Sequence, residues 1–170
     1  MKIVLVISIN LFFALVGYYY KNKIKKEIDV LEFLKDFISF YETNLVLYKN
    51  DIHEIFNNYK ITQKNKNAKQ LNIFENNDNY LKINEENLKE YVSNEYTNGL
   101  IIKYFSSIGM SDYLFEKEKL LNFKNVLSNK IIVLEKELKE KGGLFFKIML
   151  AIGMVLSILI WWKYGYFNSI

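Results

Sequence analysis

The chain has 170 residues, of which 23 are basic and 19 acidic, and a net charge of +4. Cysteine and proline are absent, which excludes disulfide scaffolds and thiolate metal sites and leaves long helices without obligatory kinks. Every basic residue is lysine, so the chain lacks the forked guanidinium that binds phosphate through two hydrogen bonds. The lysines flank apolar segments instead of forming a patch, and we therefore expect no nucleic acid partner.

The first apolar segment, Ile3 to Tyr20, contains no charged residue. As an α-helix it covers about 27 Å, close to the ~30 Å hydrocarbon core of a bilayer. We assign residues 1–20 to a transmembrane helix. A cleaved signal peptide is the alternative, but no pair of small residues suits cleavage, and the strong positive charge follows the segment instead of preceding it.

A second apolar segment, Leu144 to Trp162, predicts a second transmembrane helix over residues 144–163, followed by a short external tail over 164–170. Lysines near the inner ends of both segments are expected to set the topology. Lys21, Lys23, Lys25 and Lys26 follow the first segment, and Lys147 lies near the beginning of the second. Because basic flanks stay in the cytosol, residues 21–143 are expected there and both termini outside.

Three residues within the spans are candidates for packing one span against the other: Asn10, Gly153 and Ser157. Small residues four positions apart let two helices approach closely, and an amide can hydrogen-bond across the pair. Small and polar residues are also tolerated in a span without any such contact, so both interpretations stay open.

Between the spans, apolar residues recur every three or four positions from Leu34 to Tyr59, which predicts helices packed on one another. We expect the first helix to continue from the span to about Tyr48 and to break at Asn50 and Asp51. Residues 60–86 are rich in Asn, Lys and Gln, with few apolar positions. There we predict short helices and loops.

The helical pattern resumes at Leu88 and includes the apolar run 100–108. Gly109 is a suitable helix stop, and Ser111 or Asp112 a suitable N-cap for the next helix.

That last helix, expected over residues 112–141, carries an apolar seam: Leu120, Leu127, Ile131, Leu134 and Leu138. Gly142 and Gly143 are expected to loosen its joint with the second span. The seam fits either the core of one chain or an interface between two copies, which leaves a homo-oligomer open.

No pattern in the sequence indicates catalysis. A nucleophile beside a base, a cluster of metal ligands and a phosphate-binding loop are all missing from it. His53, the single histidine, lies on a polar helix face and is expected to be a surface residue. We therefore expect no enzymatic activity, cofactor or metal, and interpret the chain as a membrane-anchored interaction module.

Two motifs resemble the stage III sporulation protein AB family. One is YETNLVLY at residues 41–48; the other is IGMSD at 108–112, which opens a helix that runs into GLFFK at 143–147. The chain length and the two terminal spans agree with that family. The sequence departs from its pattern by lacking a proline after Tyr48 and by having Glu116 where glutamine is usual.

The resemblance implies an all-α fold: a compact bundle of about six helices, similar to an F-type platform domain of type II secretion, between two transmembrane helices. It also implies a non-enzymatic platform in the mother-cell membrane around the forespore. Such a platform docks a cytosolic ATPase similar to stage III sporulation protein AA and contacts other membrane proteins of the same channel. The candidate contact residues are Glu42, Tyr48, Gly109, Ser111, Asp112 and Glu116.

Alternative functions remain open. One is a platform component of a type II secretion or type IV pilus-like system. Another is a membrane scaffold that assembles through the apolar seams.

Overall fold

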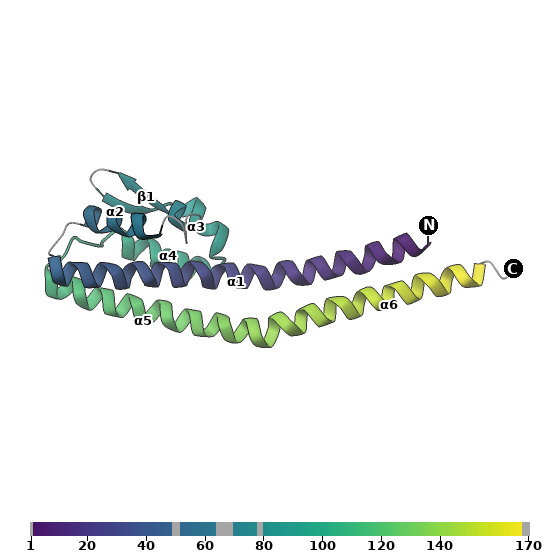
Figure 1. Ribbon diagram of the computed structural model, residues 1–170. Coiled ribbons are helices and arrows are strands. Elements are labelled where there is room, and N and C mark those ends of the chain that lie inside the picture. The colour runs from purple at the N-terminus through teal and green to yellow at the C-terminus, as the bar shows by residue number, and fades with distance from the viewer. Residues whose placement is uncertain (1, 49–51, 64–69, 78–79, 168–170) are drawn as a thin grey trace. The chain divides into compact units, whose positions relative to one another are not determined.

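The computed structural model describes residues 2–48, 52–63, 70–77 and 80–167 (Figure 1). The helices are α1 (Lys2–Tyr48), α2 (Ile52–Gln63), α3 (Glu85–Tyr91), α4 (Glu95–Phe105), α5 (Tyr113–Glu137) and α6 (Gly143–Phe167), with a 3₁₀-helix at Gln70–Ile73 and a π-helix at Leu138–Gly142. This mostly helical structure fits the expected all-α class.

The chain divides into two compact units. The bundle unit is Lys26–Ile132, and the span unit combines Met1–Lys25 with Val133–Ile170. Helix α1 runs without a break from Lys2 to Tyr48, which confirms that the first helix continues from the apolar segment. The next helix begins at Ile52. Asn50 and Asp51, where we expected the break, lie outside the described residues.

A cluster of aromatic rings lies in the core of the bundle unit. Phe37 of α1 is fully buried, and its ring lies 5.1–6.3 Å, between centroids, from five other rings. These belong to Tyr41, Phe56, Tyr59, Phe74 and Phe105. The apolar stripe along the first helices therefore lies inside the chain, as its periodicity indicated.

A β-hairpin corrects the expectation for residues 60–86. Strands β1 (Phe74–Asn77) and β2 (Tyr80–Ile83) pair antiparallel, with Phe74 opposite Ile83. Phe74, Leu81 and Ile83 are buried in the core. The prediction of short helices and loops was thus wrong for residues 74–77 and 80–83. Two strands of four residues leave too few apolar positions for their alternation to stand out among polar neighbours.

Polar side chains start three of the helices. Asn84 and Asn94 accept the backbone N–H of Asn87 and Thr97 at the starts of α3 and α4, each at 2.9 Å. Asp112 does the same for Phe115, with 3.0 Å between its Oδ1 and the nitrogen. The predicted N-cap at Asp112 is therefore confirmed.

The seam of α5 is core where it lies in the bundle unit, because Leu120, Leu127 and Ile131 are buried within the chain. We expected a single helix over residues 112–141. Helix α5 ends earlier, at Glu137, and the π-helix follows it directly. Gly143 has helical dihedral angles, with φ −72° and ψ −40°. The glycine pair therefore lies inside continuous helical structure.

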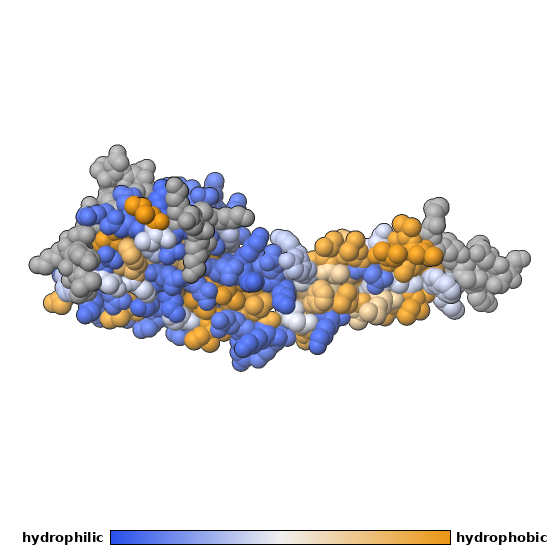
Figure 2. Space-filling model, viewed as in Figure 1, coloured by the Kyte–Doolittle hydropathy of each residue, from blue (hydrophilic) through white to orange (hydrophobic). Residues whose placement is uncertain are grey.

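In the span unit, two helices are long and apolar enough to cross a membrane. On the face shown in Figure 2, apolar side chains gather over the N-terminal part of α1 and over α6. Most of these side chains are exposed on the protein, as expected for a surface that faces lipid.

Candidate interaction site

Glu116 lies in the first turn of α5, and its side chain reaches back to the turn that joins α4 to α5. Its side chain is buried, with 1% of the residue exposed. One carboxylate oxygen accepts the backbone N–H of Gly109 at 2.9 Å, and the other lies 3.3 Å from Lys119 Nζ. Lys119 also donates to the Ser107 carbonyl at 2.7 Å. Together the two side chains hold the backbone of the turn.

Gly109 suits this turn because its φ is +76°, a left-handed conformation that other residues adopt at a cost. The helix before it ends at Phe105, four residues earlier than the expected stop at Gly109. Ser111 is half-buried, and its hydroxyl lies 3.4 Å from Lys119 Nζ. Of the candidate contact residues, Gly109, Ser111, Asp112 and Glu116 thus all take part in building one turn.

The turn and the start of α5 also present apolar side chains to solvent, beside the exposed Asp112. Met110 and Leu114 are 76% and 75% exposed, and Tyr113 and Phe115 are also exposed. We call these four residues the apolar tip. Sequence reasoning named their polar neighbours instead, although the helical period could have found Leu114 and Phe115, since it places them away from the seam at Leu120 and Leu127.

Glu42 and Tyr48, the remaining contact candidates, lie on α1. Glu42 pairs with Lys124 of α5 at 3.3 Å, with both side chains partly exposed. A partly exposed pair of this kind contributes about 0.2–1 kcal/mol to the free energy of unfolding. Tyr48 is the last residue of α1, and its side chain, like that of His53, lies outside the described part.

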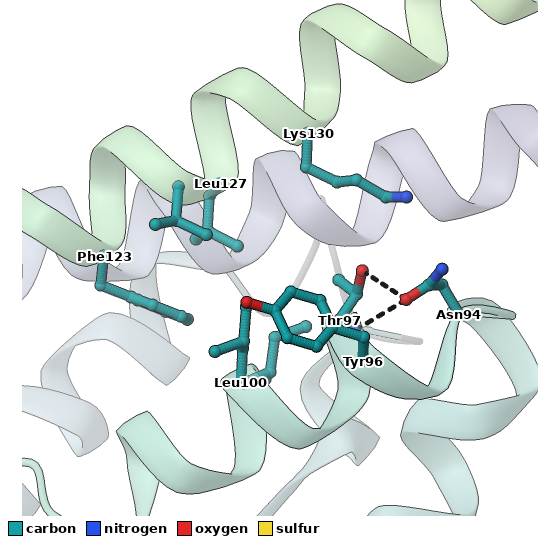
Figure 3. A pocket seen from close by; sticks show the side chains of 9 residues that line it. Asn94, Tyr96, Thr97, Leu100, Phe123, Leu127 and Lys130 are labelled. Atoms are coloured by element: carbon teal, nitrogen blue, oxygen red, sulfur yellow. Dashed lines mark hydrogen bonds between the residues drawn. The ribbon is translucent and has the colours of Figure 1, made fainter.

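A groove between α4 and α5 is the second notable surface of the bundle unit. Its volume is about 180 Å³. Phe123 and Leu127 point from α5 toward α4, and Tyr96, Leu100 and Lys130 line the groove beside them (Figure 3). The full lining is Asn94, Tyr96, Thr97, Leu100, Ile101, Phe123, Val126, Leu127 and Lys130. It is mainly apolar, with a single charged side chain, and we call it the α4–α5 groove.

Tyr104 carries a buried hydroxyl that has no hydrogen-bond partner among the described residues. Its ring stacks on Phe123 with 3.8 Å between centroids. Burial raises the pKa of Tyr104 well above its ordinary value of about 10, and the Glu116 carboxylate adds to the effect. The phenol therefore stays protonated in the folded chain.

We expect Tyr104→Phe to stabilise the bundle unit by about 1 kcal/mol, because it removes an unsatisfied buried group and keeps the stacked ring. The pH dependence gives a second readout. Above pH ~10 the tyrosine ionises only in the unfolded chain, so in the parent it lowers the free energy of unfolding by about 1.4 kcal/mol per pH unit. The variant loses this slope, which unfolding in urea at pH 9 to 11 measures.

Tyr59→Phe is the matched control. Burial also raises the pKa of Tyr59 above its ordinary value, with Asp36 adding to the effect, but its hydroxyl donates to the Phe33 carbonyl at 3.3 Å. Tyr59→Phe should therefore also remove one tyrosine's share of the decrease in stability at alkaline pH. Unlike Tyr104→Phe, it should lower the free energy of unfolding. A Tyr104→Phe variant as destabilised as Tyr59→Phe would contradict the assignment of an unsatisfied hydroxyl.

In the span unit, Asn10, Gly153 and Ser157 come together. The Asn10 amide donates to the Ser157 hydroxyl at 2.6 Å and to the Val6 carbonyl at 2.9 Å. Ser157 donates in turn to the Gly153 carbonyl at 2.8 Å. Such interhelical bonds contribute about 0.6 kcal/mol on average in membrane proteins.

Glycines bring the two helices close. A Cβ on Gly153 would lie 3.0 Å from Asn10 Oδ1, and one on Gly17 would lie 2.8 Å from the Phe146 ring and 3.1 Å from its Cα. Asn10 and Gly17 are seven residues apart, as are their partners Gly153 and Phe146. The two helices therefore pack antiparallel with a heptad spacing and small residues at the contacts.

This register predicts a disulfide between Phe13→Cys and Gly153→Cys. A Cβ on Gly153 lies 3.5 Å from the Phe13 Cβ, within the ~3.5–4.5 Å that a disulfide requires. The chain has no other cysteine, so oxidation of the full-length double variant should give one intramolecular bond, seen as faster gel migration. Phe12→Cys with Gly153→Cys is the control, since Phe12 is exposed; equal bonding in both pairs would contradict the register.

The lysines that we expected to set the topology are exposed: Lys21, Lys23, Lys25, Lys26 and Lys147. Their ammonium groups are thus available to lipid headgroups. In the described part of the chain, no group of three or more histidine, cysteine or acidic residues is placed to hold a metal ion. Comparison with protein families, curated proteins and solved structures finds no match.

Proposed function

We propose that this protein is a non-enzymatic membrane platform of a sporulation channel, which docks a cytosolic ATPase and couples it to a membrane complex. The observation that carries the proposal is a helical unit with its own aromatic core in a chain that also has two helices apolar enough to cross a membrane. The charged side chains at the α4–α5 turn, Glu116 and Lys119, form hydrogen bonds with the backbone of the turn. Beside them the turn exposes the apolar tip, and apolar surfaces of this kind often form protein contacts.

In this proposal the ATPase resembles stage III sporulation protein AA, and the bundle unit resembles an F-type platform domain of type II secretion. Residues 21–143 face the cytosol, both termini lie outside, and the membrane is that of the mother cell around the forespore. A reporter active only in the cytosol, fused after the last residue, should stay silent; an active reporter would overturn this topology.

The docking step is tested by co-purification of the full-length chain, in detergent micelles, with the ATPase encoded in the same gene cluster. We expect binding that weakens at least tenfold in Leu114→Glu, which places a charge on the apolar tip, and is unchanged in Ile61→Glu. Ile61 is 74% exposed on α2 and serves as the matched site. A parent chain that fails to bind the ATPase would remove the basis of the proposal.

A platform of a type II secretion or pilus-like system is the second candidate. The apolar span unit and the helical bundle unit favour it equally, because a platform of either kind needs both. Binding of a secretion-type ATPase in preference to the sporulation ATPase would favour this candidate.

A further inference from the structure

The bundle unit carries two apolar surfaces of opposite shape. The apolar tip projects: Met110 and Leu114 are more than two-thirds exposed, and Tyr113 and Phe115 are exposed beside them. The α4–α5 groove is recessed. Its volume of about 180 Å³ is comparable with that of the ~150 Å³ cavity that admits a benzene ring. The groove therefore has room for one large apolar side chain.

Charges beside the two surfaces are also complementary. Glu118 is exposed one helical turn after Leu114. Lys130, at the groove, forms no ion pair with any described residue. An inserted tip would bring an acidic side chain to a lysine that is otherwise unpaired, and such pairing orients an interface.

We propose that the apolar tip of one copy inserts into the α4–α5 groove of a second copy. A second copy is the occupant because both halves of the contact exist on this one chain. The exposed acidic groups beside the tip, Asp112 and Glu118, outnumber the exposed Lys117 there, which opposes binding to an anionic lipid surface. Leu114 and Val126 are twelve residues apart on α5, which places them about 120° apart around the helix.

The two patches are therefore different faces, and the contact joins unlike surfaces. A contact of this heterologous kind repeats from copy to copy, closing into a ring or continuing as a filament. The contact uses the same apolar tip as the proposed ATPase docking, so one tip serves one partner at a time. The crosslinking test needs no ATPase, and its result therefore stands if the docking function fails.

Cysteine crosslinking of the full-length chain in membranes tests the contact, since the parent has no cysteine. Leu114→Cys and Val126→Cys chains with tags of different size are co-expressed and treated with a short thiol crosslinker. We expect the mixed dimer to exceed either homodimer at least fivefold. Ile61→Cys replaces Leu114→Cys in the control, because it is an exposed apolar site of similar accessibility on another helix.

Charge reversal supplies the second arm. Glu118→Lys and Lys130→Glu should each reduce the mixed dimer severalfold, and a mixture in which the tip chain carries Glu118→Lys and the groove chain Lys130→Glu should restore it. Three outcomes overturn the proposal: predominant Leu114→Cys homodimers, which indicate a two-fold contact of tips; yields equal to the Ile61→Cys control; or yields that charge reversal leaves unchanged.

Discussion

Replacing Phe37 by alanine is expected to lower the free energy of unfolding of the bundle unit by about 3–5 kcal/mol, the largest effect of any single substitution considered. Phe37 is fully buried and its ring contacts five others, contributed by α1, α2, β1 and α4. Truncation removes apolar surface from the core and leaves a cavity that several elements would have to move together to close.

Pulse proteolysis of the full-length chain in urea measures this loss, because lysines throughout the bundle unit become cleavable on unfolding. We expect the urea midpoint to fall by at least about 1 M. Phe37→Leu, which keeps part of the volume, should lose less, and Phe115→Ala at the exposed tip should lose under about 0.5 kcal/mol. Equal losses in Phe37→Ala and Phe115→Ala would show that the ring cluster does not stabilise the bundle.

The helices of this chain are predictable from its sequence because their signals are long and local. The apolar stripe from Leu34 to Tyr59 repeats often enough to identify the buried face of α1 and α2, and the span requires only an uncharged stretch of sufficient length. Asp112 is found as an N-cap because capping depends on residues only three positions apart.

The β-hairpin is not predictable in the same way. Phe74 and Leu81 lie on paired strands and are buried in the core, where the Phe74 ring contacts Phe37. These are tertiary contacts, and strand preference depends on such contacts. The buried partner of Ser93 was missed for a related reason. Glu27 reads as one of many surface acids, yet it is buried and accepts the Ser93 backbone N–H at 3.4 Å, 66 residues away.

The candidate site was predictable in position but not in the direction of its side chains. The IGMSD motif marks the turn correctly, but the polar residues that suggested recognition are those the backbone itself requires. Met110 lies between Gly109 and Ser111 but was not named as a contact candidate. The polar side chains of this turn bond to its backbone, which leaves apolar side chains such as Met110 to form the exposed surface.

Substitutions of Glu116 test whether a polar side chain of this site stabilises the turn. We expect Glu116→Ala to destabilise the bundle unit by about 2–3 kcal/mol, because the Gly109 N–H loses its charged acceptor and Lys119 loses its counter-ion. The expected loss of stability is smaller than for breaking a fully buried ion pair, because the Lys119 side chain is 21% exposed. Unfolding in urea measures the loss, and Glu118→Ala, at an exposed neighbour, is the control.

Glu116→Gln separates the two contributions. The amide oxygen still accepts from Gly109, while the charge opposite Lys119 is gone. If the hydrogen bond to the left-handed glycine dominates, glutamine should cost about 1 kcal/mol or less. A loss equal to that of alanine would instead make the ion pair dominant, and Lys119→Met should then be as damaging as either, since it leaves the Glu116 charge buried without a partner.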